Sequence, residues 1–406
     1  MVKGNNNEEK ILFVHYGNDW IRGSEQCLID LMEQCSDQGF SVHLWTNNSS
    51  LHRYALRNNI SSEADAFPLL LGWLAPRFDF LGWGYLVRKA CKILQRESID
   101  VVHVNSGAPC QWMVLAARIK QVPMVTQLHS PYPARDRLTL GLHLSPHIIS
   151  VSEYVASQLK SEGYPREHLS VIHNGLHVSK LDEQQTVETK KVLGINDNDF
   201  LYATVGSLIH RKGIDRLIVA LRYLNFEYPN THLLVIGDGP LRNELEKHAK
   251  KLYLENRVHF VGEQNNAVGW LKGCDAFVSG ARSEAFGLVI AEAAVAKIPV
   301  VAPFEGGIPE FVQHGETGIL YPNSGVGPLS KAMRVLVDNP DFGRQLASNA
   351  SKHIGTKFNV SLSSHRIIGV YKKIMVSHQP SVSFWRTFIP LKTYLAKRIA
   401  MGGQHG

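Results

Sequence analysis

Short apolar runs alternate with helix-length segments along most of this chain, and this alternation constrains the fold more than any other feature. In the first half the predicted strands are Ile11–His15, Ser41–Thr46, Val101–Val104, Met124–Leu128, His147–Val151 and Ser170–Ile172. A helix from about Glu25 to Gln38 is predicted between the first two strands, and Gly39 ends it. Apolar strands that alternate with helices are typical of a parallel sheet covered by helices on both faces.

A second series of strands follows a polar stretch from Lys180 to Lys191. Its predicted strands are Leu201–Val205, His232–Ile236, Val258–Val261, Ala276–Ser279 and Pro299–Ala302. The two series predict an α/β fold of two Rossmann-like, doubly wound domains, whose ligands bind in a cleft at the carboxyl ends of the strands. We expect a first domain over residues 1–175, a second over 176–360, and a helical tail over 361–406 that packs back on the first domain.

Composition narrows the class of protein. A chain of 406 residues is too long for one compact core, and 44% hydrophobic with 19% charged residues is ordinary for a globular protein. The five cysteines, which show no C-x-x-C spacing, indicate reduced thiols. The polar opening segment does not resemble a signal peptide, and the most apolar stretch, Phe67–Val87, is interrupted by Pro76, Arg77 and Asp79. We therefore expect a cytoplasmic protein, with peripheral contact at the inner face of the membrane left open.

The net charge of +7 suits phosphorylated substrates, an anionic membrane or nucleic acid, although a basic surface without a partner is an alternative. Nucleic-acid binding would rest on charge alone, because no recognised module is present, and we do not expect it. The last segment combines aromatic residues with Arg386, Lys392, Lys397 and Arg398. It predicts either docking on anionic lipid or a segment packed on the first domain, and Pro390 argues against one continuous helix.

The most informative motif runs from Ser283 to Ala293 and carries Glu284 and Glu292. It follows a predicted strand, turns through a loop that ends at Gly287, and begins a helix at about Leu288. The free N–H groups of such a helix start suit a phosphate or diphosphate. Glu284 can face a sugar at the helix start, and Glu292 can accept hydrogen bonds from ribose hydroxyls. An ordinary βα unit with one capping and one surface glutamate is the alternative.

This segment resembles the Glu-x7-Glu signature of the retaining glycosyltransferases of the GT-B fold, glycosyltransferase family 4, also called the group 1 glycosyltransferases. Other stretches resemble further motifs of that family in the expected order: Gly206–Asp215, Val235–Pro240, Val258–Gly262, Gly306–Glu310 and His314–Gly318. The resemblance implies metal-independent transfer of a hexose-type sugar, with retention, from a nucleoside-diphosphate sugar, most simply a UDP-sugar. That sugar nucleotide is a co-substrate, and the resemblance implies no other cofactor.

Arg211 and Lys212 are the expected holders of the donor diphosphate, Arg211 as a fork and Lys212 as a point charge. Their charge would also stabilise the departing nucleoside diphosphate. A solvated turn is the alternative for this pair, and the family often has arginine where this chain has Ser207. The resemblance adds donor contacts from Phe286, Gly287, Leu288 and Glu292.

In the first domain, the loop Gly17–Glu25 resembles the glycine-rich loop of the family, and Gly23 is its expected donor contact. Many members have two adjacent glycines there, whereas this chain has Gly23 and Ser24. His129, after the strand Met124–Leu128, matches the histidine that faces the donor sugar. We therefore predict Glu284 and His129 as the catalytic pair, with a structural histidine as the alternative.

The acceptor is expected to be a glycan or a lipid-linked glycan, such as a growing surface polysaccharide. The apolar segment Phe67–Val87 and the basic tail favour a membrane-proximal acceptor, and internal packing of both segments is the alternative. Two other classes remain open. A sugar-nucleotide epimerase, or another GT-B enzyme, would be expected to lack the ordered charged motifs. A non-catalytic dinucleotide-binding protein would be expected to have G-x-G-x-x-G after the first strand, and this chain does not.

Overall fold

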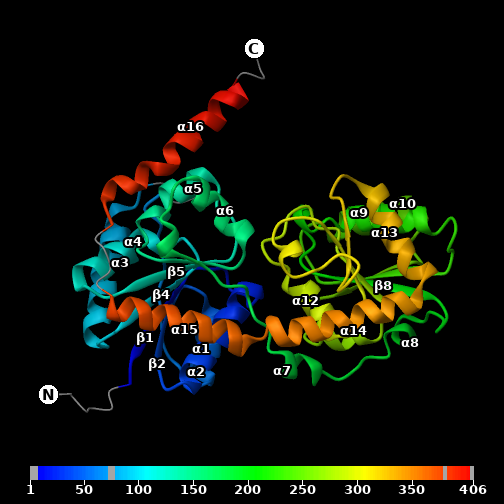
Figure 1. Cartoon of the computed structure of the whole chain (residues 1–406), viewed down its shortest axis with the longest axis horizontal. Helices are drawn as coiled ribbons and strands as arrows, with labels where there is room; N and C mark the ends of the chain where they lie inside the picture. Colours follow the sequence, from blue (N-terminus) through cyan, green and yellow to red (C-terminus); the bar gives the residue numbers. More distant parts are fainter. Residues whose placement is uncertain (1–7, 72–77, 378–381, 403–406) are drawn as a thin grey trace. The chain divides into compact units, whose positions relative to one another are not determined.

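The computed structural model describes residues 8–71, 78–377 and 382–402, and describes 396–402 by their backbone alone. The chain separates into two compact units, the first made of residues 1–173 and 361–406 and the second of residues 174–360. Each unit contains one parallel sheet with helices on both faces (Figure 1). The predicted α/β class with two Rossmann-like sheets is confirmed.

The sheet of the first unit has the strand order β3-β2-β1-β4-β5-β6-β7. Its strands are β1 (Lys10–His15), β2 (Ser41–Thr46), β3 (Ser61–Ala64), β4 (Val101–Asn105), β5 (Met124–Leu128), β6 (Ile148–Ser150) and β7 (Leu169–Val171). The order reverses between β1 and β4, so the loops after these two strands diverge to opposite faces and leave a crevice at the carboxyl edge.

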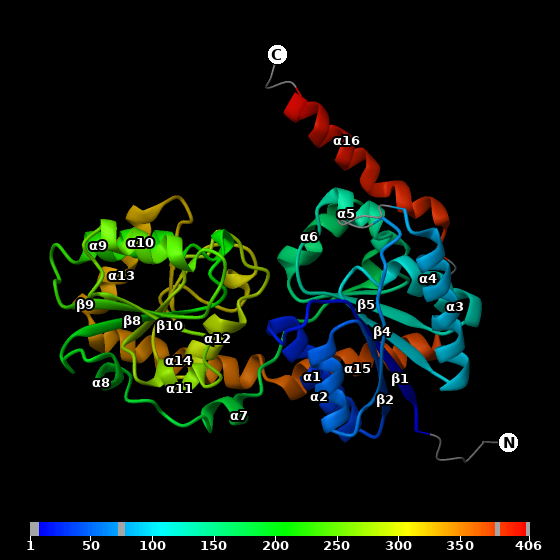
Figure 2. The ribbon, with the colours of Figure 1, turned by 180° about the vertical axis from the view of Figure 1, so that it is seen from behind.

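The first unit has eight α-helices among its described residues. They are α1 (Gly23–Asp37), α2 (Ser49–Arg57), α3 (Phe80–Arg96), α4 (Cys110–Lys120), α5 (Ala134–Thr139), α6 (Glu153–Ser161), α15 (Val360–Val376) and α16 (Ile389–Gly402). Helices α1, α2 and α15 lie on one face of the sheet, and α3 and α4 lie on the other (Figures 1 and 2). Short 3₁₀ helices occur at η1 (Leu142–Leu144), η2 (Arg166–His168) and η5 (Phe384–Phe388).

The chain returns to the first unit through α15, which completes its core. Ile367, Ile368 and Tyr371 of this helix are buried in the same cluster as Phe13 of β1. The hydroxyl of Tyr371 also forms a 2.7 Å hydrogen bond with Nδ1 of His103, in the middle of β4. Further along, α16 packs against α5. Pro390 is the second residue of α16, a position where proline is tolerated because no intrahelical N–H is required.

The second unit repeats the arrangement with the strand order β10-β9-β8-β11-β12-β13. Its strands are β8 (Phe200–Val205), β9 (Thr231–Ile236), β10 (Val258–Gly262), β11 (Ala276–Val278), β12 (Val300–Pro303) and β13 (Ile319–Tyr321). Its helices are α7 (Val178–Asp182), α8 (Thr189–Leu193), α9 (Ile214–Leu224), α10 (Arg242–Lys251), α11 (Ala267–Lys272), α12 (Leu288–Val295), α13 (Val326–Asp338) and α14 (Pro340–Lys357), with 3₁₀ turns η3 (His210–Lys212) and η4 (Ile308–Glu310). Helices α9, α10 and α13 cover one face, and α11, α12 and α14 the other (Figure 2).

Candidate functional site

The second sheet reverses its strand order between β8 and β11, which are hydrogen-bonded neighbours. In sheets of this kind, ligands bind outside the carboxyl ends of the strands at this point. The loop after β8 carries Arg211 and Lys212, and the loop after β11 carries Glu284. The topology therefore brings three of the predicted site residues to one edge of the sheet.

The three side chains form an ion cluster. Nζ of Lys212 lies 2.6 Å from Oε2 of Glu284, and Nη1 of Arg211 lies 3.4 Å from Oε1. Arg211 also donates to the backbone oxygen of Ser283 at 3.0 Å. Burial raises the pKa of Glu284, but the charges and hydrogen bonds of Lys212 and Arg211 outweigh it and hold the pKa below its ordinary value. Glu284 is therefore ionised at neutral pH, and in the ligand-free chain it neutralises one of the two cations predicted to hold the diphosphate.

The two loops of the site are joined through their backbones. The N–H of Arg282 donates to the carbonyl of Arg211 at 2.8 Å, and the Arg282 guanidinium binds the Asp215 carboxylate with contacts of 2.8 and 2.6 Å. Gly213, with φ of +64°, lies so close to the backbone of Gly280 that a Cβ on Gly213 would be 1.9 Å from the Gly280 carbonyl oxygen. Arg282 is not among the predicted site residues, although its place two residues before Glu284 could have singled it out.

A third loop fixes the backbone of Glu284. The N–H of Gly307 donates to the backbone carbonyl oxygen of Glu284 at 3.1 Å, and a Cβ on Gly306 would lie 1.9 Å from the same carbonyl oxygen. Gly306 has φ of +58°, a conformation that glycine adopts without strain. The motif Gly306–Glu310 thus supports the carboxylate loop.

Helix α12 presents the remaining predicted donor contacts. Gly287 precedes it, and Leu288 is its first residue, so the first N–H groups of the helix are available to an anion. Glu292 lies one turn further on and is partly buried. Burial raises the pKa of Glu292 to about 7, against the opposing charge of Lys212. The Phe286 ring is buried 4.8 Å from the Phe311 ring, so only the backbone of Phe286 can meet a ligand.

The predicted residues of the first unit lie at the carboxyl edge of its sheet. Gly23 is the first residue of α1, and His129 follows β5 directly. Nε2 of His129 lies 2.7 Å from Oδ1 of Asn105 at the end of β4. Burial, with a smaller effect of His15, lowers the pKa of His129 to about 4, so its ring is neutral at neutral pH. Asn105 and His15 are not among the predicted site residues.

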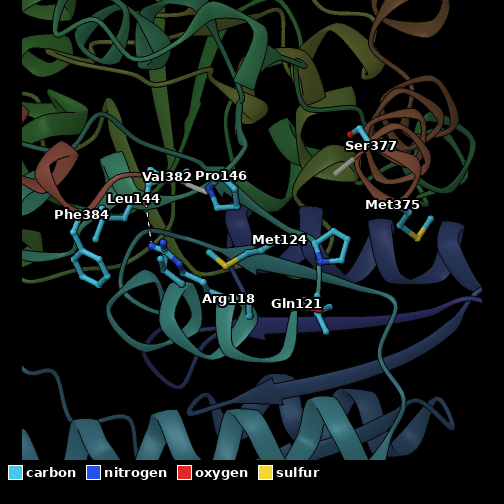
Figure 3. Close-up of a pocket in the computed structure, with 13 residues that line it drawn as sticks. Arg118, Gln121, Met124, Leu144, Pro146, Met375, Ser377, Val382 and Phe384 are labelled. Carbon is cyan, nitrogen blue, oxygen red and sulfur yellow. Dashed lines mark hydrogen bonds between the residues drawn. The ribbon is translucent and has the colours of Figure 1, made fainter. Parts of the chain in front are cut away.

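A cavity of about 490 Å³ occupies a different place in the first unit (Figure 3). It is lined mainly by apolar side chains, among them Met124 at the start of β5 and Leu144 at the end of η1. Arg118 donates to the Val382 oxygen at 3.1 Å beside it. His129 lies beyond the opposite end of β5, about 16 Å of strand away, so this cavity is separate from the predicted site.

Within residues 8–71, 78–377 and 382–402, no group of three or more His, Cys, Asp or Glu side chains could hold a metal ion. In the same part of the chain, no helix has the length and apolar character that crossing a bilayer requires. Metal-independent transfer stays a prediction.

The two Rossmann-like sheets have the architecture of the GT-B fold. The family model "Glycosyl transferases group 1" matches residues 185–353, and the model "Glycosyltransferase Family 4" matches residues 21–180. Together the two matches cover most of the chain. The chain therefore belongs to the group 1, family 4 glycosyltransferases.

Individual relatives agree with this assignment. The chain is 24% identical to N-acetyl-alpha-D-glucosaminyl L-malate synthase of Bacillus anthracis, over 87% of this chain and 93% of the relative. It is 26% identical to a lipopolysaccharide core biosynthesis glycosyltransferase of Rhizobium meliloti, over 86% of this chain and 94% of the relative. The fold matches the crystal structure of Anabaena HepE in complex with UDP with a TM-score of 0.76 and 24% identity, over 90% of this chain and 100% of that one. These findings do not favour the epimerase or the non-catalytic alternative.

Proposed function

We propose that this glycosyltransferase moves a hexose-type sugar, with retention, from a UDP-sugar to a hydroxyl of a glycan or lipid-linked glycan during surface polysaccharide or glycoconjugate synthesis. The observation that carries the donor half of this proposal is the cluster of Arg211, Lys212 and Glu284 beside the start of α12. Structures of HepE with UDP and with UDP-glucose support the choice of nucleotide. The Rhizobium relative supports the class of acceptor.

In this proposal the diphosphate enters between the two cations and the first N–H groups of α12. Arg211 and Lys212 then neutralise the charge that develops as the bond from the sugar to the phosphate breaks. Glu284 turns from the cations toward the sugar, and Glu292 accepts hydrogen bonds from the ribose hydroxyls. These groups supply the charge that a divalent cation supplies in metal-dependent transferases.

Retention is proposed to follow a front-face route, in which the leaving phosphate takes the proton of the acceptor hydroxyl. The new bond then forms on the face that the phosphate leaves. The test incubates the full chain with UDP-, GDP- and ADP-sugars and a panel of glycan acceptors, and reads the anomer of the product by NMR. One UDP-sugar consumed with its anomeric configuration kept supports the proposal, and an inverted product contradicts the front-face route.

Membrane contact is the second part of the proposal. Phe80 and Leu81 at the start of α3 are 64% and 90% exposed, and Trp385 of η5 is 79% exposed next to Arg386. Exposed apolar and aromatic side chains beside a half-buried arginine suit an anionic bilayer. Residues 72–77 of the apolar segment lie outside the described residues, while Phe67 and Leu69 are buried and serve internal packing.

Vesicle sedimentation tests this contact. We expect the full chain to bind vesicles of mixed phosphatidylglycerol and phosphatidylcholine, and to bind pure phosphatidylcholine weakly. The double variant Leu81→Ser and Trp385→Ser should lose most of this binding. A matched control replaces Tyr253 of the second unit, which is 81% exposed, with serine. Equal binding of both variants would contradict the proposed membrane face.

A further inference from the structure

Four side chains form a continuous chain of polar contacts at the carboxyl edge of the first sheet. Oε1 of Glu25 lies 3.3 Å from Nε2 of His15, and Nδ1 of His15 lies 3.0 Å from Nδ2 of Asn105. Oδ1 of Asn105 then lies 2.7 Å from Nε2 of His129. Glu25, His15 and Asn105 are each at most 4% exposed, so water does not compete for these contacts.

The carboxylate of Glu25 determines which atom donates and which accepts in each of these contacts. Burial raises the pKa of Glu25, but the neighbouring His15 and the backbone N–H groups of Arg22 and Glu25 outweigh it and lower the pKa below its usual value. An ionised carboxylate only accepts hydrogen bonds, so the single proton of a neutral His15 ring is favoured on Nε2, which lies 3.3 Å from the carboxylate without a hydrogen bond of good geometry, and Nδ1 keeps a lone pair. That lone pair accepts the Asn105 amide N–H, which leaves the amide oxygen to accept Nε2–H from His129.

The remaining ring nitrogen of His129 is consequently an acceptor. Burial holds the pKa of His129 at about 4, so the ring carries a single proton at neutral pH, and Asn105 holds it at Nε2. Nδ1 is buried, and among the described residues it has no hydrogen-bond partner. A buried acceptor of this kind is stabilised when a ligand brings a donor to it.

We propose that Glu25, His15 and Asn105 are positioning residues that fix the Nε2–H tautomer of His129, so that its Nδ1 accepts a hydrogen bond from one hydroxyl of the transferred sugar. The identity of the ligand rests on the proposed function, in which His129 faces the donor sugar. The fixed tautomer does not depend on that function, because it follows from contacts within the first unit.

The isosteric substitution Glu25→Gln is expected to exchange the donor and acceptor in each of these contacts. The second oxygen of Glu25 accepts the backbone N–H of Arg22 at 3.0 Å, so a glutamine must place its oxygen there. Its NH₂ group then faces His15 and donates to Nε2, which moves the His15 proton to Nδ1. The Asn105 side-chain amide then rotates by 180°, so that its oxygen accepts a hydrogen bond from Nδ1–H of His15. Its NH₂ group now donates to Nε2 of His129. His129 is left with its proton on Nδ1.

The first experiment reads the tautomer directly. The full chain is labelled with ¹⁵N-histidine, and the two ring nitrogens of His129 are identified by comparison with His129→Gln at pH 7. We expect a protonated Nε2 and an unprotonated Nδ1 in the wild type, and the reverse in Glu25→Gln. Glu33→Gln is the matched control, because Glu33 lies on the same helix and accepts from Tyr54 instead. A wild-type ring protonated at Nδ1, or an unchanged ring in Glu25→Gln, would overturn the proposal.

The second experiment tests the ligand with UDP and a panel of deoxyfluoro UDP-sugars. Fluorine cannot donate a hydrogen bond, so at one sugar position it should weaken binding to the wild type about tenfold, and Glu25→Gln should lose this discrimination. The affinities of the wild type and of Glu25→Gln for UDP alone should differ by no more than about twofold. Discrimination that persists in Glu25→Gln would overturn the assignment of Nδ1 to a sugar hydroxyl. A wild type that binds no UDP-sugar would refute the proposed function, while the tautomer experiment still decides the positioning role.

Discussion

Lys212 is the residue on which the donor site depends most, because it acts on both carboxylates of the motif. It lies 2.6 Å from Glu284, and its charge also reaches Glu292. A diphosphate would gain the same charge. In the proposed donor site, the Lys212–Glu284 pair is the ligand-free state, and the diphosphate replaces the Glu284 carboxylate as the partner of Lys212.

Replacing Lys212 with methionine should weaken UDP binding by roughly 10- to 100-fold, since a charged hydrogen bond contributes about 1.5–3 kcal/mol. Lys190 is a matched control, because it lies 2.8 Å from Asp275 in the same unit and has similar exposure. The Lys190→Met variant should lose about as much folding stability as Lys212→Met, but it should bind UDP as tightly as the wild type. Calorimetric titration of both variants with UDP measures the difference, and equal losses of affinity would show that the effect is only structural.

The raised pKa of Glu292 predicts how stability changes with pH. Burial brings the pKa to about 7 in the folded chain, above the ordinary value of 4.5. The folded state therefore holds a proton that the unfolded state releases, and stability falls as pH rises from about 4.5 to 7, by at most about 1.4 kcal/mol per pH unit. Glu292→Gln should remove this fall. Urea unfolding of the wild type and the variant between pH 4.5 and 8.5 checks it, and a constant difference in unfolding free energy would contradict a protonated Glu292 in the folded chain.

At the scale of elements, the loops after β8 and β11 must touch backbone to backbone for the site to form. Gly213→Ala should therefore destabilise the second unit by about 3 kcal/mol or more, because its Cβ would meet the Gly280 oxygen at 1.9 Å in addition to the strain of a positive φ. Gly194 has nearly the same φ, +66°, with no atom within 4 Å of a Cβ. Gly194→Ala should cost only about 1–2 kcal/mol. Equal unfolding free energies for the two variants would show that the close approach is unimportant.

The sequence predicted most strands to within one residue, because their apolar runs mark them as buried. It missed β3 (Ser61–Ala64), whose Ser-Ser-Glu-Ala sequence is polar because the strand lies at the sheet edge, where Glu63 pairs with Lys89. It also missed β13 (Ile319–Tyr321), an apolar stretch that directly follows the motif His314–Gly318, although it predicted three other strands of three residues, β6, β7 and β11. Strand patterns report burial, so an exposed strand such as β3 escapes them.

Motif resemblance predicted the charged residues of the second unit, whereas the contacts of His129 could not be predicted. His15 and Asn105 are 90 residues apart, and they meet because the parallel register pairs them at the ends of β1 and β4. No local pattern encodes that register. The ion pairs of Glu284 with Arg211 and Lys212 depend in the same way on the adjacency of β8 and β11.

At the scale of the whole molecule, the first unit is completed by the end of the chain. Removing residues 361–406 takes Tyr371 and three buried isoleucines of α15 out of the core, and it removes the hydrogen bond between Tyr371 and His103. We expect the first unit to unfold and the second to stay folded. Removing only residues 382–406 should leave both units folded. Hydrogen exchange of both truncated chains checks this, and a protected β4 in the shorter chain would contradict the account.

The proposed function requires a sugar nucleotide to bind at the switch point of the second sheet. Hydrogen exchange of the full chain, with and without saturating UDP-glucose, tests it most directly. We predict slower exchange in the loops after β8 and β11, from Gly206 to Ile214 and from Ser283 to Glu292, and unchanged exchange around Arg118 and Phe384 beside the separate cavity. Protection confined to that cavity, or no protection anywhere in a folded chain, would contradict the claim.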